Sequence, residues 1–192
     1  MEKLTGLKKI KTAIFISGTG SNLKNLIKFA RLKKSPISIN LIVSNTNKAK
    51  GLNFANQFKI KNKIFNFKNI KVSEEKILKL LQIEKIQFIC LAGFMKILSK
   101  NFIKKFDGKI INIHPSLLPK YKGLNTHFRA INNKDKFAGC TVHYVTEKLD
   151  SGKIILQKKI KITTNDNPIS LAKKVLKHEH KLYPAAIKKI LN

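Results

Sequence analysis

Short apolar runs alternate along this chain with segments whose apolar residues recur at helical spacing, and this alternation constrains the fold more than any other feature. The strand-like runs lie at 11–17, 37–43, 63–67, 87–92 and 109–111, and helical patterns separate them at 23–30, 48–58, 73–84 and 99–105. Neighbouring parallel strands need crossover connections, which helices usually supply. The alternation therefore predicts a parallel sheet with helices on both faces.

The last third of the chain has a different pattern. Two strand-like runs, 137–145 and 153–162, are joined by a short turn and followed by a long helical pattern at 168–191. We expect an α/β fold: a mostly parallel, Rossmann-like sheet with helices on both faces, and a C-terminal β-hairpin plus long helix. A chain of 192 residues with 43% hydrophobic content suits one domain, 1–192.

A glycine loop, G-T-G-S-N at 18–22, lies between the first strand and the first helix. The free N–H groups and the dipole of a helix N-terminus favour an anion there, most often phosphate. A dinucleotide site needs a third glycine, where this chain has Leu23, and an acid after the second strand, where it has Ser44 and Asn45. The loop therefore fits a monophosphate better than a dinucleotide, and an ordinary glycine turn is the alternative.

The segment after the fifth strand carries an amide and an imidazole two residues apart. Asn112 and His114 should point the same way, because alternate side chains of a strand share a face. Pro115 and Pro119 constrain the following loop, and Gly123 permits a turn that most residues avoid. Such a pair can stabilise negative charge that develops on an oxygen atom. A strand end with an ordinary proline-rich loop is the alternative.

Ligands of such sheets bind outside the carboxyl ends of the strands. The glycine loop, the Asn112–His114 pair and the apolar segment 93–98 all follow strand ends, so they should share one edge. Segment 93–98 could form a wall for a flat ring, or simply cover the core. Asp150 is either a carboxylate beside His114 or a turn former. We interpret His143 as a structural histidine.

The net charge of +30 suggests a nucleic-acid or membrane partner at first sight. The lysines are dispersed, however, and arginine occurs only at Arg31 and Arg129, so we expect neither partner. The polar start, residues 1–6, does not resemble a signal peptide, which predicts a cytoplasmic protein. Cys90 and Cys140 lack metal-binding spacing and should be reduced.

Four motifs, in order, resemble the phosphoribosylglycinamide formyltransferases of purine synthesis. They are I-S-G-T-G-S-N-L at 16–23, L-A-G-F-M-K-I-L-S at 91–99, I-N-I-H-P-S-L-L-P-K-Y-K-G-L at 111–124 and G-C-T-V-H-Y-V-T-E-K-L-D-S-G-K-I-I-L-Q at 139–157. The resemblance covers nearly the whole chain. It implies transfer of the formyl group of 10-formyltetrahydrofolate to the amine of 5-phosphoribosylglycinamide, in de novo synthesis of IMP, without a metal.

The resemblance also implies a role for each half of the chain. Residues 11–100 would form the phosphate-binding half, in which Gly20, Ser21 and Asn22 hold the substrate phosphate. Residues 101–192 would form the folate-binding and catalytic half, in which Glu179 faces the glycinamide.

The implied catalytic set is Asn112, His114 and Asp150. Asp150 would raise the pKa of His114 by favouring the charged imidazole, and could help to deprotonate the attacking amine. The implied folate-binding residues are Met95, Lys96, Ile97, Leu98, Asn112, Thr146, Glu147, Lys148, Leu149 and Asp150.

The chain departs from the family pattern in two places. Many members have an arginine near the start of the helix expected at 73–84, where it meets the folate tail, and this chain has Glu74 and Glu75. Lys71 or Lys76 could substitute. A histidine that is usual after the proline loop is replaced by Asn125.

Two relatives share this chemistry and provide the alternatives. Methionyl-tRNA formyltransferase has a further C-terminal domain, and formyltetrahydrofolate hydrolase has an additional N-terminal regulatory domain. The expected partners are small molecules alone, and the protein should be a monomer or a homodimer.

Overall fold

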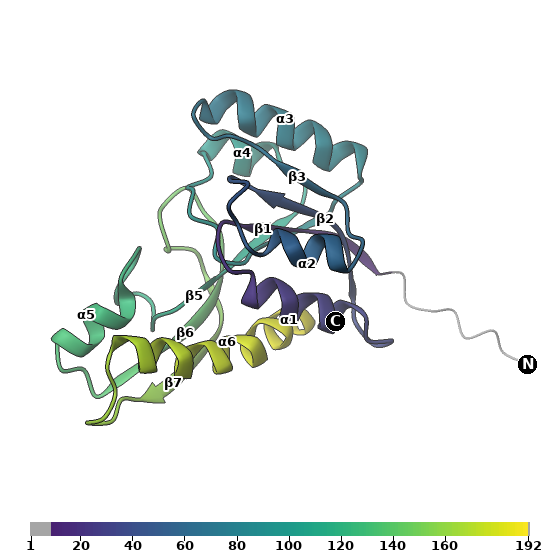
Figure 1. Cartoon of the computed structure of the whole chain (residues 1–192). Coiled ribbons are helices and arrows are strands. Elements are labelled where there is room, and N and C mark those ends of the chain that lie inside the picture. The colour runs from purple at the N-terminus through teal and green to yellow at the C-terminus, as the bar shows by residue number, and fades with distance from the viewer. Residues whose placement is uncertain (1–8, 192) are drawn as a thin grey trace, which may run out of the picture.

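The computed structural model describes residues 9–191, so the interpretation of residues 1–6 lies outside the described part (Figure 1). Its elements follow in the order β1 (Ile10–Ile16), α1 (Ser21–Ala30), β2 (Ile37–Ser44), α2 (Leu52–Gln57), β3 (Asn62–Ile64), α3 (Ile70–Ile83), β4 (Phe88–Leu91), α4 (Lys100–Lys105), β5 (Lys109–His114), α5 (Thr126–Asn132), β6 (Phe137–Tyr144), β7 (Ile154–Lys161) and α6 (Pro168–Leu191).

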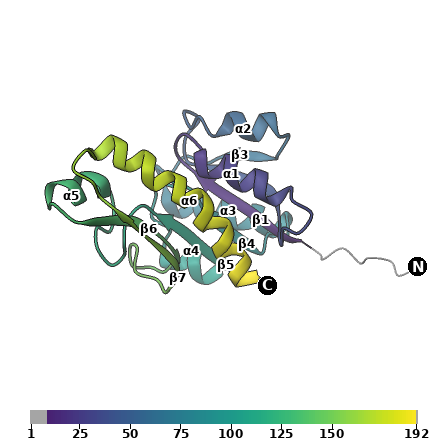
Figure 2. The ribbon, with the colours of Figure 1, turned by 90° about the horizontal axis from the view of Figure 1, so that it is seen from below.

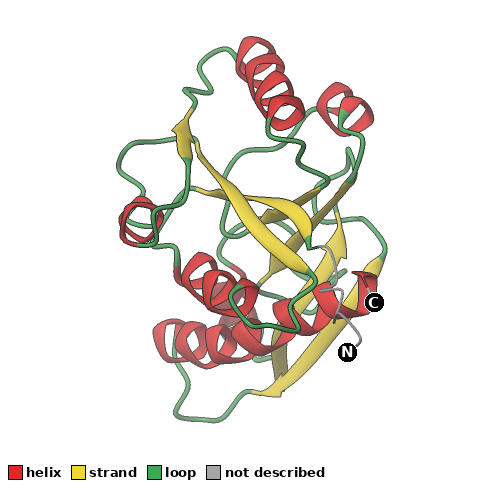
Figure 3. Cartoon of the chain, turned by 90° about the vertical axis from the view of Figure 1, so that its right-hand side faces the viewer, coloured by secondary structure: helices red, strands yellow, loops and turns green. Residues whose placement is uncertain are grey.

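The strands form one sheet in the order β3-β2-β1-β4-β5-β6-β7. The first five strands of that order run parallel, whereas β6 is antiparallel to β5, and β7 is antiparallel to β6. The strands cross the middle of the molecule with helices on either side (Figure 3). The predicted mostly parallel sheet with a C-terminal hairpin and long helix is confirmed.

Each face of the sheet has its own apolar core. Alternate side chains of β1 point to opposite faces, so Ile14 and Ile16 pack with α1, α2 and α6, whereas Ala13 and Phe15 pack with α3 and α4. Helices α1 and α6 lie side by side over the first face (Figures 1 and 2). The N-terminal part of α6 packs with α5 and the hairpin in a third cluster that includes Ala130 and Val175.

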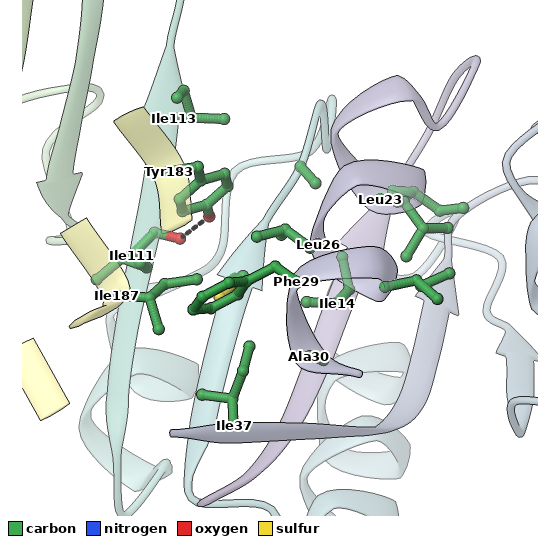
Figure 4. Packing of buried hydrophobic residues seen from close by; sticks show 14 of the residues in the cluster. Ile14, Leu23, Leu26, Phe29, Ala30, Ile37, Ile111, Ile113, Tyr183 and Ile187 are labelled. Atoms are coloured by element: carbon green, nitrogen blue, oxygen red, sulfur yellow. Dashed lines mark hydrogen bonds between the residues drawn. The ribbon is translucent and has the colours of Figure 1, made fainter. Parts of the chain in front are cut away.

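Tyr183 joins α6 to the centre of the sheet (Figure 4). Its side chain is fully buried, and its hydroxyl lies 3.0 Å from the Leu91 carbonyl oxygen and 3.2 Å from that of Ile111. A buried hydroxyl needs such partners, because leaving it without a hydrogen bond is costly. Tyr183 therefore holds the last helix on the strands that lead to the candidate site.

Tyr183→Phe should lower the free energy of unfolding by about 1–2 kcal/mol, because the ring still fills its space but the hydrogen bonds are lost. Urea unfolding at neutral pH measures this change. Tyr144→Phe is the matched control, since among residues 9–191 the Tyr144 hydroxyl makes no hydrogen bond. Equal stability of the wild type and Tyr183→Phe would contradict the prediction.

Three of the element boundaries that differ from the sequence prediction have a clear physical reason. The helix expected at 48–58 starts only at Leu52, because the preceding turn docks on the glycine loop, where the Gly51 amide donates to the Gly18 carbonyl at 3.0 Å. The strand expected at 63–67 ends at Ile64, and Phe67 turns into the core. The helix expected from residue 73 begins at Ile70, because the Asn69 side chain caps it.

The described helices include none that is both long and apolar enough to cross a membrane. Cys90 and Cys140 are free and buried.

Candidate active site

The carboxyl ends of three adjacent parallel strands bring the predicted site residues to one edge of the sheet. The glycine loop follows β1, segment 93–98 follows β4, and Asn112 and His114 form the end of β5. The turn between β6 and β7 brings Asp150 to the same edge, where it contacts both Asn112 and His114.

His114 is held at both ring nitrogens. Its Nε2 lies 2.8 Å from the Tyr121 carbonyl oxygen, and its Nδ1 lies 3.3 Å from Asp150 Oδ2. Burial lowers the pKa of His114, and the Tyr121 carbonyl and the Asp150 carboxylate raise it only in part. The neutral imidazole therefore predominates at pH 7. Asp150 raises the pKa of His114 as expected, but the effect of burial is larger, so the net pKa lies below the ordinary value.

Asp150 is a buried, hydrogen-bonded carboxylate. Its Oδ2 accepts from the Gly123 amide at 2.9 Å, and its Oδ1 lies 3.4 Å from Asn112 Nδ2 and 3.6 Å from His143 Nε2. Burial alone would raise the pKa of Asp150, but the bonds from His143 and Gly123 and the nearby histidines together lower it. Asp150 is consequently ionised at neutral pH. The turn predicted at Gly123 is confirmed, with a φ of 75°.

His143 belongs to this site, although its sequence context suggested a structural role. It is 2% exposed, and its Nδ1 lies 2.8 Å from the Tyr144 carbonyl oxygen. Its Nε2 lies 3.3 Å from Asn112 Nδ2 and 3.6 Å from Asp150 Oδ1. The signal that could have identified it is strand register, because antiparallel pairing sets His143 directly opposite Asn112.

A pocket beside this cluster collects most of the residues expected to bind folate. Its walls come from both halves of the chain: Leu91, Phe94, Lys96, Ile97, Leu98, Asn112, His143, Val145, Thr146, Lys148, Leu149 and Asp150.

Met95 and Glu147 are not among the residues that line the pocket. The Met95 amide donates to Ser17 Oγ at 2.7 Å, and its side chain is exposed. Glu147 pairs with Lys100 at 3.0 Å. Glu74 stands where the family pattern predicts an arginine for the folate tail. It is buried, and its carboxylate accepts from the Ser99 amide at 2.7 Å. It therefore ties α3 to the end of the segment that forms the pocket wall.

The glycine loop is closely packed at Gly20. This residue precedes α1 with a φ of 77°, and a Cβ atom there would lie 2.5 Å from Gly51 Cα, so only glycine fits. Asn22 follows in the first turn, and its Nδ2 donates to Glu179 Oε2 at 2.6 Å, which joins the loop to α6.

Across residues 9–191, His, Cys, Asp and Glu side chains form no group of three that could hold a metal ion.

Glu179→Gln should make the protein more stable at neutral pH. Burial raises the pKa of Glu179, and the Asn22 bond lowers it only in part. The folded state thus retains a proton that the unfolded state has released, so stability falls as pH rises from the ordinary pKa of 4.5 towards the folded value. Glutamine keeps an acceptor for Asn22 and removes the buried charge, which should add about 1 kcal/mol at pH 7.

Urea unfolding of wild type and Glu179→Gln at pH 7 and at pH 4 measures this difference, which should shrink at pH 4. Glu84→Gln, at a surface pair with Lys61, is the matched control. A variant less stable than wild type at pH 7 would contradict the assignment of a costly buried charge.

Comparisons with known proteins match most of this chain. The model of the formyl transferase family matches residues 10–187. The human trifunctional purine biosynthetic protein adenosine-3 is 42% identical to this chain over 183 residues. The match covers 94% of this chain but only 18% of the human protein, so the chain spans less than a fifth of that relative. The phosphoribosylglycinamide formyltransferase of Haemophilus influenzae is 42% identical over 181 residues, covering 93% of this chain and 85% of that protein.

Solved structures are similar over the same region. The phosphoribosylglycinamide formyltransferase of Brucella melitensis superposes with a TM-score of 0.90 at 43% identity and covers 96% of both chains. That of Anaplasma phagocytophilum has a TM-score of 0.88 at 40% identity, covering 94% of this chain and 86% of its own. The chain therefore belongs to the formyl transferase family and, within it, to the phosphoribosylglycinamide formyltransferases.

Proposed function

We propose that this protein transfers the formyl group of 10-formyltetrahydrofolate to the amine of 5-phosphoribosylglycinamide, a step in the synthesis of IMP. The observation that carries this proposal is the cluster of Asn112, His114 and Asp150 at the carboxyl edge of the sheet, beside an open pocket. The names of the relatives in Haemophilus and Brucella support the same reaction.

The phosphate of the ribonucleotide binds at Gly20, Ser21 and Asn22 in this proposal. The left-handed Gly20 opens helix α1, where free N–H groups and the helix dipole favour an anion. The strongly basic surface increases the rate of encounter with an anionic substrate. Glu179 reaches this loop through Asn22, which supports a contact between Glu179 and the glycinamide end.

The folate binds in the pocket, with its flat ring between segment 95–98 and the turn 146–150. Ile97 and Leu149 offer exposed apolar surface there, and main-chain groups supply polar contacts. Met95 and Glu147 contribute at the rim. The cosubstrate is 10-formyltetrahydrofolate, and no metal takes part.

The reaction needs a base for the amine and donors for the formyl oxygen. The amine attacks the formyl carbon while negative charge grows on the formyl oxygen, and Asn112 Nδ2 donates to that oxygen. Ionised Asp150 accepts a proton from the amine, directly or through a water molecule. With Oδ2 3.3 Å from His114 Nδ1, Asp150 can pass that proton on, so the imidazole becomes cationic as the oxyanion forms. When this intermediate collapses, the bond between the formyl carbon and N10 of the folate breaks, and the proton returns through Asp150 to the leaving N10.

The proposal also covers the domain organisation, the location, the partners and the oligomeric state of the protein. We infer a single domain over 1–192, a cytoplasmic location, small molecules as the only partners, and a monomer or homodimer.

The test is formyl transfer by the purified chain, followed by the absorbance change of the folate. We expect turnover that disappears when 5-phosphoribosylglycinamide is omitted. Folate consumption without that acceptor would instead indicate a hydrolase, and transfer to methionyl-tRNA alone would indicate the other relative. Either result would overturn the proposal.

A further inference from the structure

The loop after β5 contacts both members of the His114–Asp150 pair through its main chain. The Tyr121 carbonyl oxygen lies 2.8 Å from His114 Nε2, and the Gly123 amide donates to Asp150 Oδ2 at 2.9 Å. The same Asp150 oxygen lies 3.3 Å from His114 Nδ1. Segment 121–123 therefore bridges the imidazole and the carboxylate from one side.

The side chain of Tyr121 anchors this segment to the loop after α5. Its hydroxyl donates to Asp135 Oδ2 at 2.8 Å and accepts from Asn133 Nδ2 at 2.8 Å. Lys120 Nζ lies 3.1 Å from the other oxygen of Asp135, so one carboxylate holds two consecutive loop residues.

Arg129 holds the segment from helix α5. Its Nη1 donates to the Lys122 carbonyl at 2.7 Å, and its guanidinium lies 4.9 Å from the centroid of the Tyr121 ring. The peptide group that carries the Tyr121 carbonyl is thus fixed on both sides, by Tyr121 through Asp135 and by Lys122 through Arg129. Lys122 Nζ also donates to Ser151 Oγ at 2.6 Å, next to Asp150.

The backbone of Tyr121 indicates that this anchoring matters. Its φ of 56° is left-handed, a conformation that is unfavourable for a non-glycine residue. Such conformations persist where the surroundings hold them, often at functional sites. Here the left-handed turn directs a carbonyl at the imidazole.

The neutral imidazole of His114 has one N–H group and two acceptors, the Tyr121 carbonyl and the Asp150 carboxylate. The shorter contact is at Nε2, which favours the tautomer with the proton on Nε2 and leaves Nδ1 free to accept a proton. The other ionisable groups that influence the imidazole are His143 from β6, and His127 and Arg129 from α5.

We propose that Tyr121 is a positioning residue, anchored by Asp135 and Arg129, whose main-chain carbonyl holds His114 in the Nε2–H tautomer. Nδ1 then faces Asp150, ready to receive the proton that leaves the amine. The kinetic part of this inference rests on the proposed formyl transfer, whereas the tautomer can be measured in the protein alone.

The first experiment is a nitrogen NMR measurement of the His114 tautomer at neutral pH. Wild type should show the proton on Nε2. Tyr121→Phe and Asp135→Ala each break the anchor and should increase the Nδ1–H population. Because both changes remove the same hydrogen bond, the double variant should shift the tautomer little further than either single variant. Asp166→Ala is the matched control, because it removes another lysine-paired aspartate, at 2.9 Å from Lys174.

The second experiment is formyl-transfer kinetics on the same variants. Tyr121→Phe and Asp135→Ala should lower kcat by about 10-fold and leave KM within about 2-fold, since the imidazole is misplaced while the binding surfaces remain. Wild-type tautomer and kcat in both variants would overturn the proposal. If wild type transfers no formyl group but the tautomer still shifts, the proposed function fails and the positioning role stands.

Discussion

His114→Ala should lower kcat for formyl transfer by about 10³-fold, because it removes the acceptor of the proton held by Asp150 and with it the nearby cation that stabilises the developing oxyanion. The substrates should still bind, since the pocket is built mainly from residues 96–98 and the turn that carries Thr146, Lys148 and Leu149. Single-turnover kinetics with both substrates bound measures the chemical step without the influence of product release.

The fold should survive this substitution. His114 is a buried polar group, and its loss should change the free energy of unfolding by less than about 2 kcal/mol. His180→Ala is a suitable control, because burial lowers the pKa of His180 as it does that of His114, yet His180 lies on α6. A folded His114→Ala variant with a rate within tenfold of wild type would remove His114 from the catalytic set.

Asp150→Asn should cause a loss of kcat of similar or greater size, about 10³- to 10⁴-fold, because asparagine fills the same space but cannot take a proton from the amine. The NH₂ group of the asparagine side chain would also face other donors, because the Gly123 and Asn112 N–H groups both point at the Asp150 carboxylate. The same assay measures the effect, with Asp166→Asn as the control.

The pH dependence of stability provides a second measurement on Asp150→Asn. The bonds from His143 and Gly123, together with the nearby histidines, outweigh burial and hold the pKa of Asp150 below its ordinary value of 3.8. A lowered folded pKa means that ionised Asp150 stabilises the fold above pH 3.8 and that this stability is lost as pH falls through the folded value. Wild type should therefore exceed Asp150→Asn in stability at pH 7, and the gap should close in acid. Near-wild-type turnover or a gap that widens in acid would contradict the assignment.

The elements of the fold could be predicted from local pattern. Apolar runs and helical periodicity located the strands and every helix except α5, and the long helix was placed correctly at Pro168–Leu191. Boundaries failed where distant packing decided them. The start of α2 depends on the contact of Gly51 with the glycine loop, and a local periodicity carries no information about that contact.

The sequence by itself determined the fold class and the shared edge of the site, because residue types and strand ends are local properties, and the resemblance of its motifs to a known family pointed to Asn112, His114 and Asp150. Only the tertiary structure decided that His143 faces Asn112, that Glu74 is buried against Ser99, and that the Tyr121 carbonyl holds His114. It also decided the protonation of His114, whose pKa depends on the competition between burial and nearby charges. These contacts and this pKa depend on distances between segments that are remote in the chain. Those distances are set only when the helices pack on the sheet.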